Sequence, residues 1–338
     1  MAIKTSTKKT NSGPSANLGL LLGIAFSLLF TGLIWWLDPL LADIALLPDQ
    51  GASWYEWKLP VPTSITRISA WASYLIHQVG MWAMIYYAQT RTHKYGDGLH
   101  RINVIALAWN AIFIAWHIVQ THLWYDGLAQ DVSIWSSQVS VVILLIWVIL
   151  MENPRRGVFF GKKAPISKQI VAFARKYHGY YFAWATIYTF WYHPAVSTPG
   201  HLLGFFYMFL LLLQASLFFT RAHVNRVWTF VLEAIVLIHG TIVAIYQGAN
   251  LWPMFFFGFA GIFIVTQMHG LGLSRRSRYV LAGLYALGAV WIYSGRGLDK
   301  VYELVAIPLI DYAGLFILVG LLWPFSKLLK KGSTTQST

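Results

Sequence analysis

Apolar segments long enough to cross a lipid bilayer recur along the whole of this 338-residue chain. A run of about 18 or more apolar residues is typical of a transmembrane helix. We place ten such spans, at residues 18–37, 67–89, 102–125, 133–151, 179–194, 201–220, 227–247, 253–271, 279–295 and 308–326. Only 11% of the residues are charged, whereas soluble domains carry roughly 25%. The expected fold class is an all-α, polytopic integral membrane protein with about ten transmembrane helices.

The charged residues are divided unequally between the two sides of these spans. If residue 1 lies inside, all but four of the 25 Lys and Arg residues fall on the inner side, and most acidic residues fall on the outer side. The four exceptions are Lys58, Arg67, Arg296 and Lys300. Cytoplasmic connections carry the excess of basic residues, so we expect both termini to be cytoplasmic, in a bacterial cytoplasmic membrane. The net charge of +13 is scattered over several inner segments, which argues against a nucleic-acid partner.

We expect a single transmembrane domain at 17–331, between a disordered basic cytoplasmic tail at 1–16 and a disordered tail at 332–338. The longest outer loop, 38–66, is expected to fold on the membrane surface. The basic inner loop, 152–178, alternates apolar and basic residues at helical spacing over 165–177. That pattern predicts an interfacial amphipathic helix that binds anionic lipids of the cytoplasmic leaflet. A docking surface for a cytosolic partner is the alternative.

Three of the eleven histidines fall deep inside predicted spans, at a similar depth. They are His77, His117 and His239, on the second, third and seventh spans. Polar groups at such depth usually face a protein interior or a cavity. Imidazole is a suitable ligand for Zn, Cu and Fe. Because the chain has no cysteine, a transition-metal site in it is expected to use histidine ligands. The alternative is that each ring bonds a carbonyl or hydroxyl group of a neighbouring helix.

A second histidine pattern brackets the fifth span. His178 and His193 are 15 residues apart, which places them about 60° apart around a helix and about 22 Å apart along it. This resembles b-type cytochromes, in which one helix gives a ligand to each of two stacked hemes. The resemblance covers this helix only, and it implies heme b with further ligands such as His269 on the inner side and His201 on the outer side. Interfacial histidines without a cofactor are the alternative.

Two acidic residues are the candidate catalytic groups. Glu233 is the only carboxylate well inside a span, where an acid is by default a proton carrier or a ligand. It is also open to neutralisation by Arg226 or by a Ser/Thr neighbour. Asp126 follows the third span and belongs to an outer group with Asp131, His193, His201 and Tyr246 that is able to form a polar pocket.

Three functions are compatible with these features. The first is a membrane-embedded redox or electron-transfer protein that holds heme b or a His-bound Fe, Cu or Zn ion and exchanges electrons with quinone. The second is a lipid- or glycan-modifying transferase that uses the outer Asp and His residues. The third is a proton-coupled transporter that uses Glu233 with the three deep histidines. Whether the protein is an enzyme stays open.

Overall fold

The computed structural model describes residues 14–48, 50–51, 55, 57–91, 95–248 and 250–334, with side chains as far as residue 324. In this part of the chain ten α-helices follow one another: α1 (Ala16–Leu37), α2 (Ser64–Arg91), α3 (Arg101–Trp124), α4 (Ile134–Arg156), α5 (Lys168–Tyr192), α6 (Pro199–Ser216), α7 (Arg226–Tyr246), α8 (Trp252–Val265), α9 (Arg275–Arg296) and α10 (Glu303–Thr334). Four short 3-10 helices lie between them: η1 (Asp38–Leu41), η2 (Leu128–Gln130), η3 (Gln267–Gly270) and η4 (Leu298–Lys300). Each predicted span coincides with one α-helix.

Seven helical segments of the described chain are long and apolar enough to cross a membrane. They contain α1, α3, α4, α6, α7, α8 and α10. Large apolar side chains on their surface are exposed, such as Leu29 at 68% and Trp36 at 68%. In a soluble protein such a surface would be costly to hydrate, whereas lipid tails accommodate it. The chain is therefore a multi-pass membrane protein.

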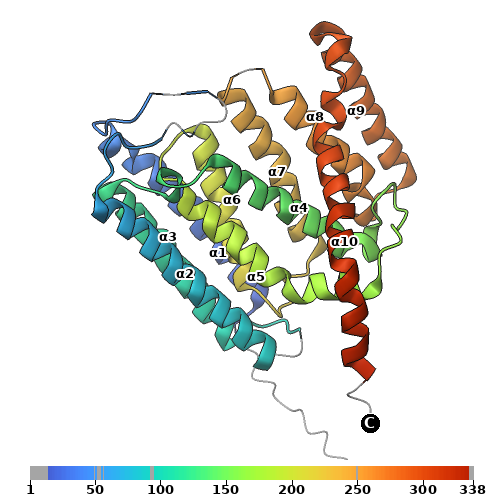
Figure 1. Ribbon diagram of the computed structural model, residues 1–338, viewed down its shortest axis with the longest axis horizontal. Helices are drawn as coiled ribbons and strands as arrows, with labels where there is room; N and C mark the ends of the chain where they lie inside the picture. The colour runs from blue at the N-terminus through green and yellow to red at the C-terminus, as the bar shows by residue number, and fades with distance from the viewer. Residues whose placement is uncertain are drawn as a thin grey trace, which may run out of the picture.

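Helix α5 lies at the centre of the bundle (Figure 1). It packs against α2, α4 and α6, while α2 and α3 form a pair on one side of the molecule. On the other side α8 contacts α7, α9 and α10. Helix α7 therefore bridges the two sides, because it packs on both α6 and α8.

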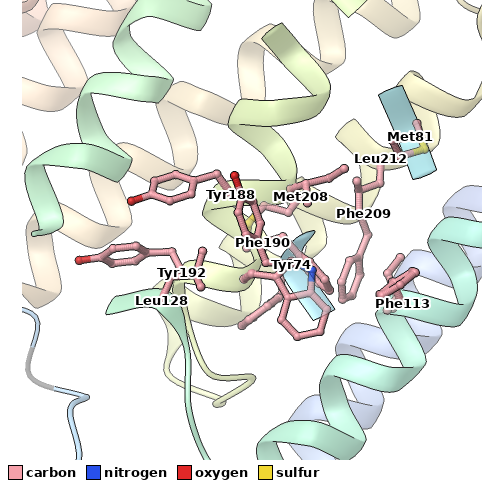
Figure 2. Close-up of a cluster of buried hydrophobic side chains, with 14 of the residues drawn as sticks. Tyr74, Met81, Phe113, Leu128, Tyr188, Phe190, Tyr192, Met208, Phe209 and Leu212 are labelled. Atoms are coloured by element: carbon pink, nitrogen blue, oxygen red, sulfur yellow. The ribbon is translucent and has the colours of Figure 1, made fainter. Parts of the chain in front are cut away.

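An aromatic cluster fills the space around the last turns of α5 (Figure 2). Phe190, Trp191 and Tyr192 are each 0% exposed, and Phe190 also contacts Phe209 of α6 with ring centroids 6.2 Å apart. Large rings bury much apolar surface, and edge-to-face contacts orient them. This packing holds the end of α5 in a fixed position relative to α2, α3 and α6.

The basic inner loop is shorter than predicted. Helix α4 continues to Arg156 and α5 begins at Lys168, so the connection spans only 157–167. Ser167 caps α5 by accepting a hydrogen bond from the amide of Gln169. Residues 168–177 of the predicted interfacial helix form the first turns of α5, and their apolar side chains pack with those of α4 and α10, with Ile170 buried. Binding of anionic lipids by the basic side chains of this segment stays a prediction.

The predicted tails lie largely outside the described residues. Of the tail at 1–16, only residues 14–16 are described, and Ala16 already begins α1. Helix α10 continues through 332–334, and residues 335–338 lie outside the described chain.

Candidate functional site

Buried polar side chains gather at both ends of the central helix α5. The histidine end is the segment 193–201 that joins α5 to α6, and the arginine end is the segment 156–168 that joins α4 to α5. Helix α5 has 25 residues, so the two ends are about 37 Å apart.

At the histidine end, Tyr55 joins the two histidines that flank the α5–α6 connection. Its hydroxyl lies 2.9 Å from Nδ1 of His193 and 3.0 Å from Nε2 of His201. The other ring nitrogen of His201 lies 2.7 Å from the hydroxyl of Thr198, which caps α6. The Trp57 ring packs edge-on against His201, with centroids 4.4 Å apart. The prediction placed His193 and His201 in one pocket, and the structure brings them together.

This group has two consistent hydrogen-bond arrangements. A hydroxyl has one hydrogen, so Tyr55 donates to one histidine and accepts from the other. If Tyr55 donates to His193, then His201 donates from Nε2 and accepts at Nδ1 from Thr198. If Tyr55 donates to His201, then His193 donates to Tyr55 and His201 donates from Nδ1. The two arrangements differ only in where protons sit, so a proton can pass along the chain without moving heavy atoms.

The two deeper histidines lie on either side of Trp191. The Trp191 indole N–H donates to Nδ1 of His77 over 3.2 Å, so Nε2 of a neutral His77 carries the hydrogen and donates to Oδ1 of Asn110 over 2.7 Å. His117 packs against the same tryptophan at 4.4 Å and donates from Nε2 to the carbonyl of His193 over 2.8 Å. His77 thus has both nitrogens occupied, whereas Nδ1 of His117 has no partner among the described residues.

The third deep histidine points to a different helix. His239 donates from Nε2 to the carbonyl of Gly200, 3.2 Å away at the start of α6. This approach needs Gly204, because a Cβ there would lie 3.0 Å from Nε2 of His239. In the described chain, no three His, Asp or Glu side chains come close enough to hold one metal ion. A metal bound by His77, His117 and His239 stays a prediction.

His239 leads toward Glu233 along the interface of α6 and α7. The ring of Tyr207 on α6 lies 6.4 Å from that of His239, and Tyr207 is also within electrostatic range of Glu233. Side chains able to bind or donate a proton therefore follow one another from the histidine end toward the arginine end. In order they are His193, Tyr55, His201, His239, Tyr207 and Glu233, and we call them the proton ladder.

Glu233 pairs with Arg156, the last residue of α4. Oε2 of Glu233 accepts from Nη1 of Arg156 over 2.6 Å, and the two side chains are 11% and 3% exposed. Arg156 falls within the predicted inner loop 152–178, but α4 extends to Arg156 and turns its guanidinium inward. Of the ways in which Glu233 was open to neutralisation, pairing with Arg226 is wrong, because Arg156 holds that position.

A cavity of about 290 Å³ adjoins this ion pair, between α4, α7, α8 and α10. Arg156, Glu233, Gln267 and Asp311 lie on its wall, and the remaining lining is largely phenylalanine and aliphatic. Asp311 is 2% exposed and lies inside the bundle. Such a pocket, apolar with a few convergent polar groups, is the usual form of a small-molecule site.

Asp126 lies outside the helices, in the connection between α3 and η2. It is 3% exposed, and its Oδ1 accepts from the amide of Gly127 over 2.7 Å. The connection packs tightly on the end of α5, since a Cβ at Gly127 would lie 2.6 Å from the carbonyl oxygen of Tyr192. Burial raises the pKa of Asp126 to about 6. This acid therefore changes charge near neutral pH beside the histidine end.

The predicted heme ligands fall into two places. His193 is the residue after α5 and has extended backbone, so the helical angle predicted between it and His178 does not apply. His178 contacts His223, with ring centroids 6.0 Å apart, and donates to a carbonyl of its own helix. His269, the proposed inner partner, lies on η3 and accepts from Arg278 over 3.1 Å. Heme b stays a prediction, which the visible spectrum of the purified protein tests.

Four residues of this description were missed at the sequence level: Tyr55, Arg156, Tyr207 and Asp311. Arg156 ends a long apolar run, and an arginine there is equally typical of a cytoplasmic loop. Tyr55 and Tyr207 are two of 18 tyrosines in a chain whose aromatic residues are expected at both membrane surfaces.

Comparison of the chain with known proteins finds no matching protein family, curated protein or solved structure.

Proposed function

We propose that the protein is a proton-coupled membrane transporter whose proton path is the proton ladder. The observation that carries this proposal is the hydrogen-bonded group of His193, Tyr55 and His201, beyond which His239, Tyr207 and Glu233 follow along the interface of α6 and α7 without hydrogen bonds to one another among the described residues. Ionisable residues inside membrane spans usually mark ion or proton pathways. Glu233, at the end of this path, adjoins the cavity, so its protonation can be coupled to the binding of a substrate there.

Tyr55 supports a relay better than a purely structural role. A structural hydrogen bond needs only one arrangement of donor and acceptor. At His77 the arrangement is fixed, because Trp191 only donates to Nδ1 and Nε2 therefore donates to Asn110. Tyr55 has two equivalent arrangements between His193 and His201, and each moves the proton to the other side of the hydroxyl.

The distribution of basic residues supports a direction for the path. Most Lys and Arg residues belong to connections on the same side as the arginine end. We propose that this end and both termini are cytoplasmic, so protons enter from outside through the histidine end and reach Glu233 in the inner half of the bundle.

Proton flux into liposomes tests the proposal. Purified protein is reconstituted with a pH-sensitive dye inside, and an external pH below the internal pH drives protons inward, with small organic ions present outside as candidate substrates. The wild-type protein is expected to acidify the interior faster than protein-free liposomes do. Tyr55→Phe, which removes the hydroxyl between the two histidines, is expected to lower this protein-dependent flux at least tenfold.

Two control variants separate the relay from general damage. Tyr192→Phe removes another buried tyrosine hydroxyl, one that donates to the carbonyl of Val132 and lies off the ladder. His122→Asn removes a histidine that bonds the backbone carbonyls of Ile118 and Leu37 and lies off the ladder. Both are expected to keep wild-type flux. Flux no faster than in protein-free liposomes, or equal flux in Tyr55→Phe and wild type, contradicts the proposal.

A further inference from the structure

The Arg156–Glu233 pair leaves part of the arginine unused. Arg156 contacts Glu233 through Nη1, while Nε and Nη2 are buried and have no hydrogen-bond partner among the described residues. Unpaired donors of a buried guanidinium are costly, more so than those of a neutral group. Arg156 lies on the cavity wall, and a small turn of its side chain would present these two covered atoms to an acceptor in the cavity.

The two unused atoms are the pair suited to a carboxylate. Nε–H and Nη2–H of an arginine point in the same direction, and together they form the side of the guanidinium that binds two carboxylate oxygens at once. Glu233 uses only Nη1 and leaves this side free. A lysine, with a single ammonium group, lacks the paired geometry.

The rest of the cavity wall is mostly apolar, which determines what part of a ligand can lie beyond its carboxylate. Phe230, Phe256, Phe259 and Phe263 line the cavity together with aliphatic side chains. Such a wall binds an alkyl chain or an aromatic ring, and its other polar side chains besides the ion pair are Gln267 and Asp311. The volume of about 290 Å³ lies at the lower end of the sizes typical of ligand pockets.

Charge balance then links the ligand to a proton. Arg156 and Glu233 neutralise one another when the cavity is empty. A carboxylate that pairs with Arg156 adds one negative charge inside the membrane, where an uncompensated charge is expensive. One proton on Glu233 restores neutrality, and the ladder ends at that residue.

We propose that the cavity binds a small monocarboxylate with an apolar body through Nε and Nη2 of Arg156, and that Glu233 takes up one proton for each carboxylate bound. The carboxylate site stands on the cavity and the arginine alone, whereas the route of the proton rests on the proposed function.

Other charged groups also lie near Glu233. On α4, Arg155 directly precedes Arg156 and Glu152 lies one turn before it; both act on Glu233, and they pair with each other. From α6 only Tyr207 is close, and from α10 Asp311 lies on the cavity wall. Asp311 keeps its protonation state during binding in this proposal, so its replacement leaves the proton count unchanged.

Calorimetry of the full chain in lipid nanodiscs tests both parts. The probes are benzoate and octanoate, with benzylamine and octylamine as probes of opposite charge, and empty nanodiscs give the reference for partitioning into lipid. Titration in buffers of different ionisation enthalpy counts the protons taken up. We expect saturable binding of the carboxylates, at least tenfold tighter than of the amines, with about one proton taken up per carboxylate.

Four variants locate the site. Arg156→Lys is expected to weaken carboxylate binding at least tenfold, and the matched control Arg155→Lys is expected to leave it unchanged. Glu233→Gln resembles the protonated glutamate, so it is expected to bind carboxylate at least as tightly as wild type with no proton uptake. Asp311→Asn is expected to keep the count at one proton. Thermal unfolding of each variant confirms that it is folded.

The outcomes separate this inference from the proposed function. Absence of saturable carboxylate binding, or equal binding by wild type and Arg156→Lys, overturns the carboxylate site even if proton flux is present. A wild-type proton count near zero overturns the coupling to Glu233. Arginine-dependent binding without any proton flux in liposomes leaves the site standing and overturns the transporter.

Discussion

The two ends of α5 bury polar groups in different ways. At the histidine end the groups are neutral and hydrogen-bonded into chains, with Tyr55 between His193 and His201. At the arginine end a charged pair is 3% and 11% exposed, and two guanidinium nitrogens have no partner among the described residues. Satisfied neutral chains add rigidity and can relay protons, whereas an incompletely satisfied charge favours a ligand. One membrane bundle thus contains a relay and a binding site, each with the polar chemistry that its task needs.

Breaking the ion pair at the arginine end is expected to have the largest effect on stability. Arg156→Met and Glu233→Met each leave the other charge buried alone, which costs about 3–5 kcal/mol of unfolding free energy. The double variant removes both charges and is expected to recover most of the loss. Thermal unfolding in detergent measures all three. If the double variant lost as much unfolding free energy as the two single variants together, the two charges would not interact.

Removing His77 is expected to destabilise the fold without stopping proton flux. His77→Phe leaves the N–H of Trp191 and Oδ1 of Asn110 without their partner, at about 1–3 kcal/mol each. His77 lies off the ladder, so flux per folded molecule is expected to equal that of wild type. Tyr55→Phe also leaves two ring nitrogens without their partner, so it is expected to show a similar loss of stability but, unlike His77→Phe, a large loss of flux. Loss of flux in His77→Phe would extend the path to this residue.

The sequence predicts the helices well, because spanning a bilayer demands a long apolar run and each run stands out. Ten predicted spans correspond to ten helices of the described chain, and seven of these helices are long and apolar enough to cross a membrane. The depth of a histidine follows from its place in the run, but its direction depends on helix packing. His77 and His117 reach the same Trp191, while His239, at a similar depth, turns to the carbonyl of Gly200.

Partners that come from distant segments could not be predicted. Arg156 and Glu233 are 77 residues apart, and a terminal arginine of an apolar run gives no sign that it points inward. Tyr55 belongs to a connection without regular periodicity, and it meets His193 and His201 because that connection folds back over the bundle.

Asp126 offers a pH-dependent test at the histidine end. Its pKa rises from 3.8 to about 6 because the buried carboxylate is poorly solvated. The native state therefore gains stability from the neutral acid below about pH 4 and loses it as the pH rises through 6, by up to about 3 kcal/mol. Asp126→Asn is expected to be more stable than wild type at pH 8 and equal to it at pH 4. An equal difference at both pH values would show that the benefit comes from packing rather than ionisation.

The smallest effect is expected where an ion pair is exposed. Arg67 and Asp131 pair at 2.8 Å near the histidine end, with side chains 47% and 27% exposed. Water and salt screen such pairs, so Arg67→Gln is expected to cost about 0–1 kcal/mol and less at high salt. Arg296 contacts both oxygens of Glu303 with side chains 13% and 5% exposed, so Arg296→Gln is expected to cost several times more. Thermal unfolding at low and high salt measures both variants. A large cost for Arg67→Gln would mean that the loop at the histidine end is held by charge, and the contrast between a neutral end and a charged end would then need revision.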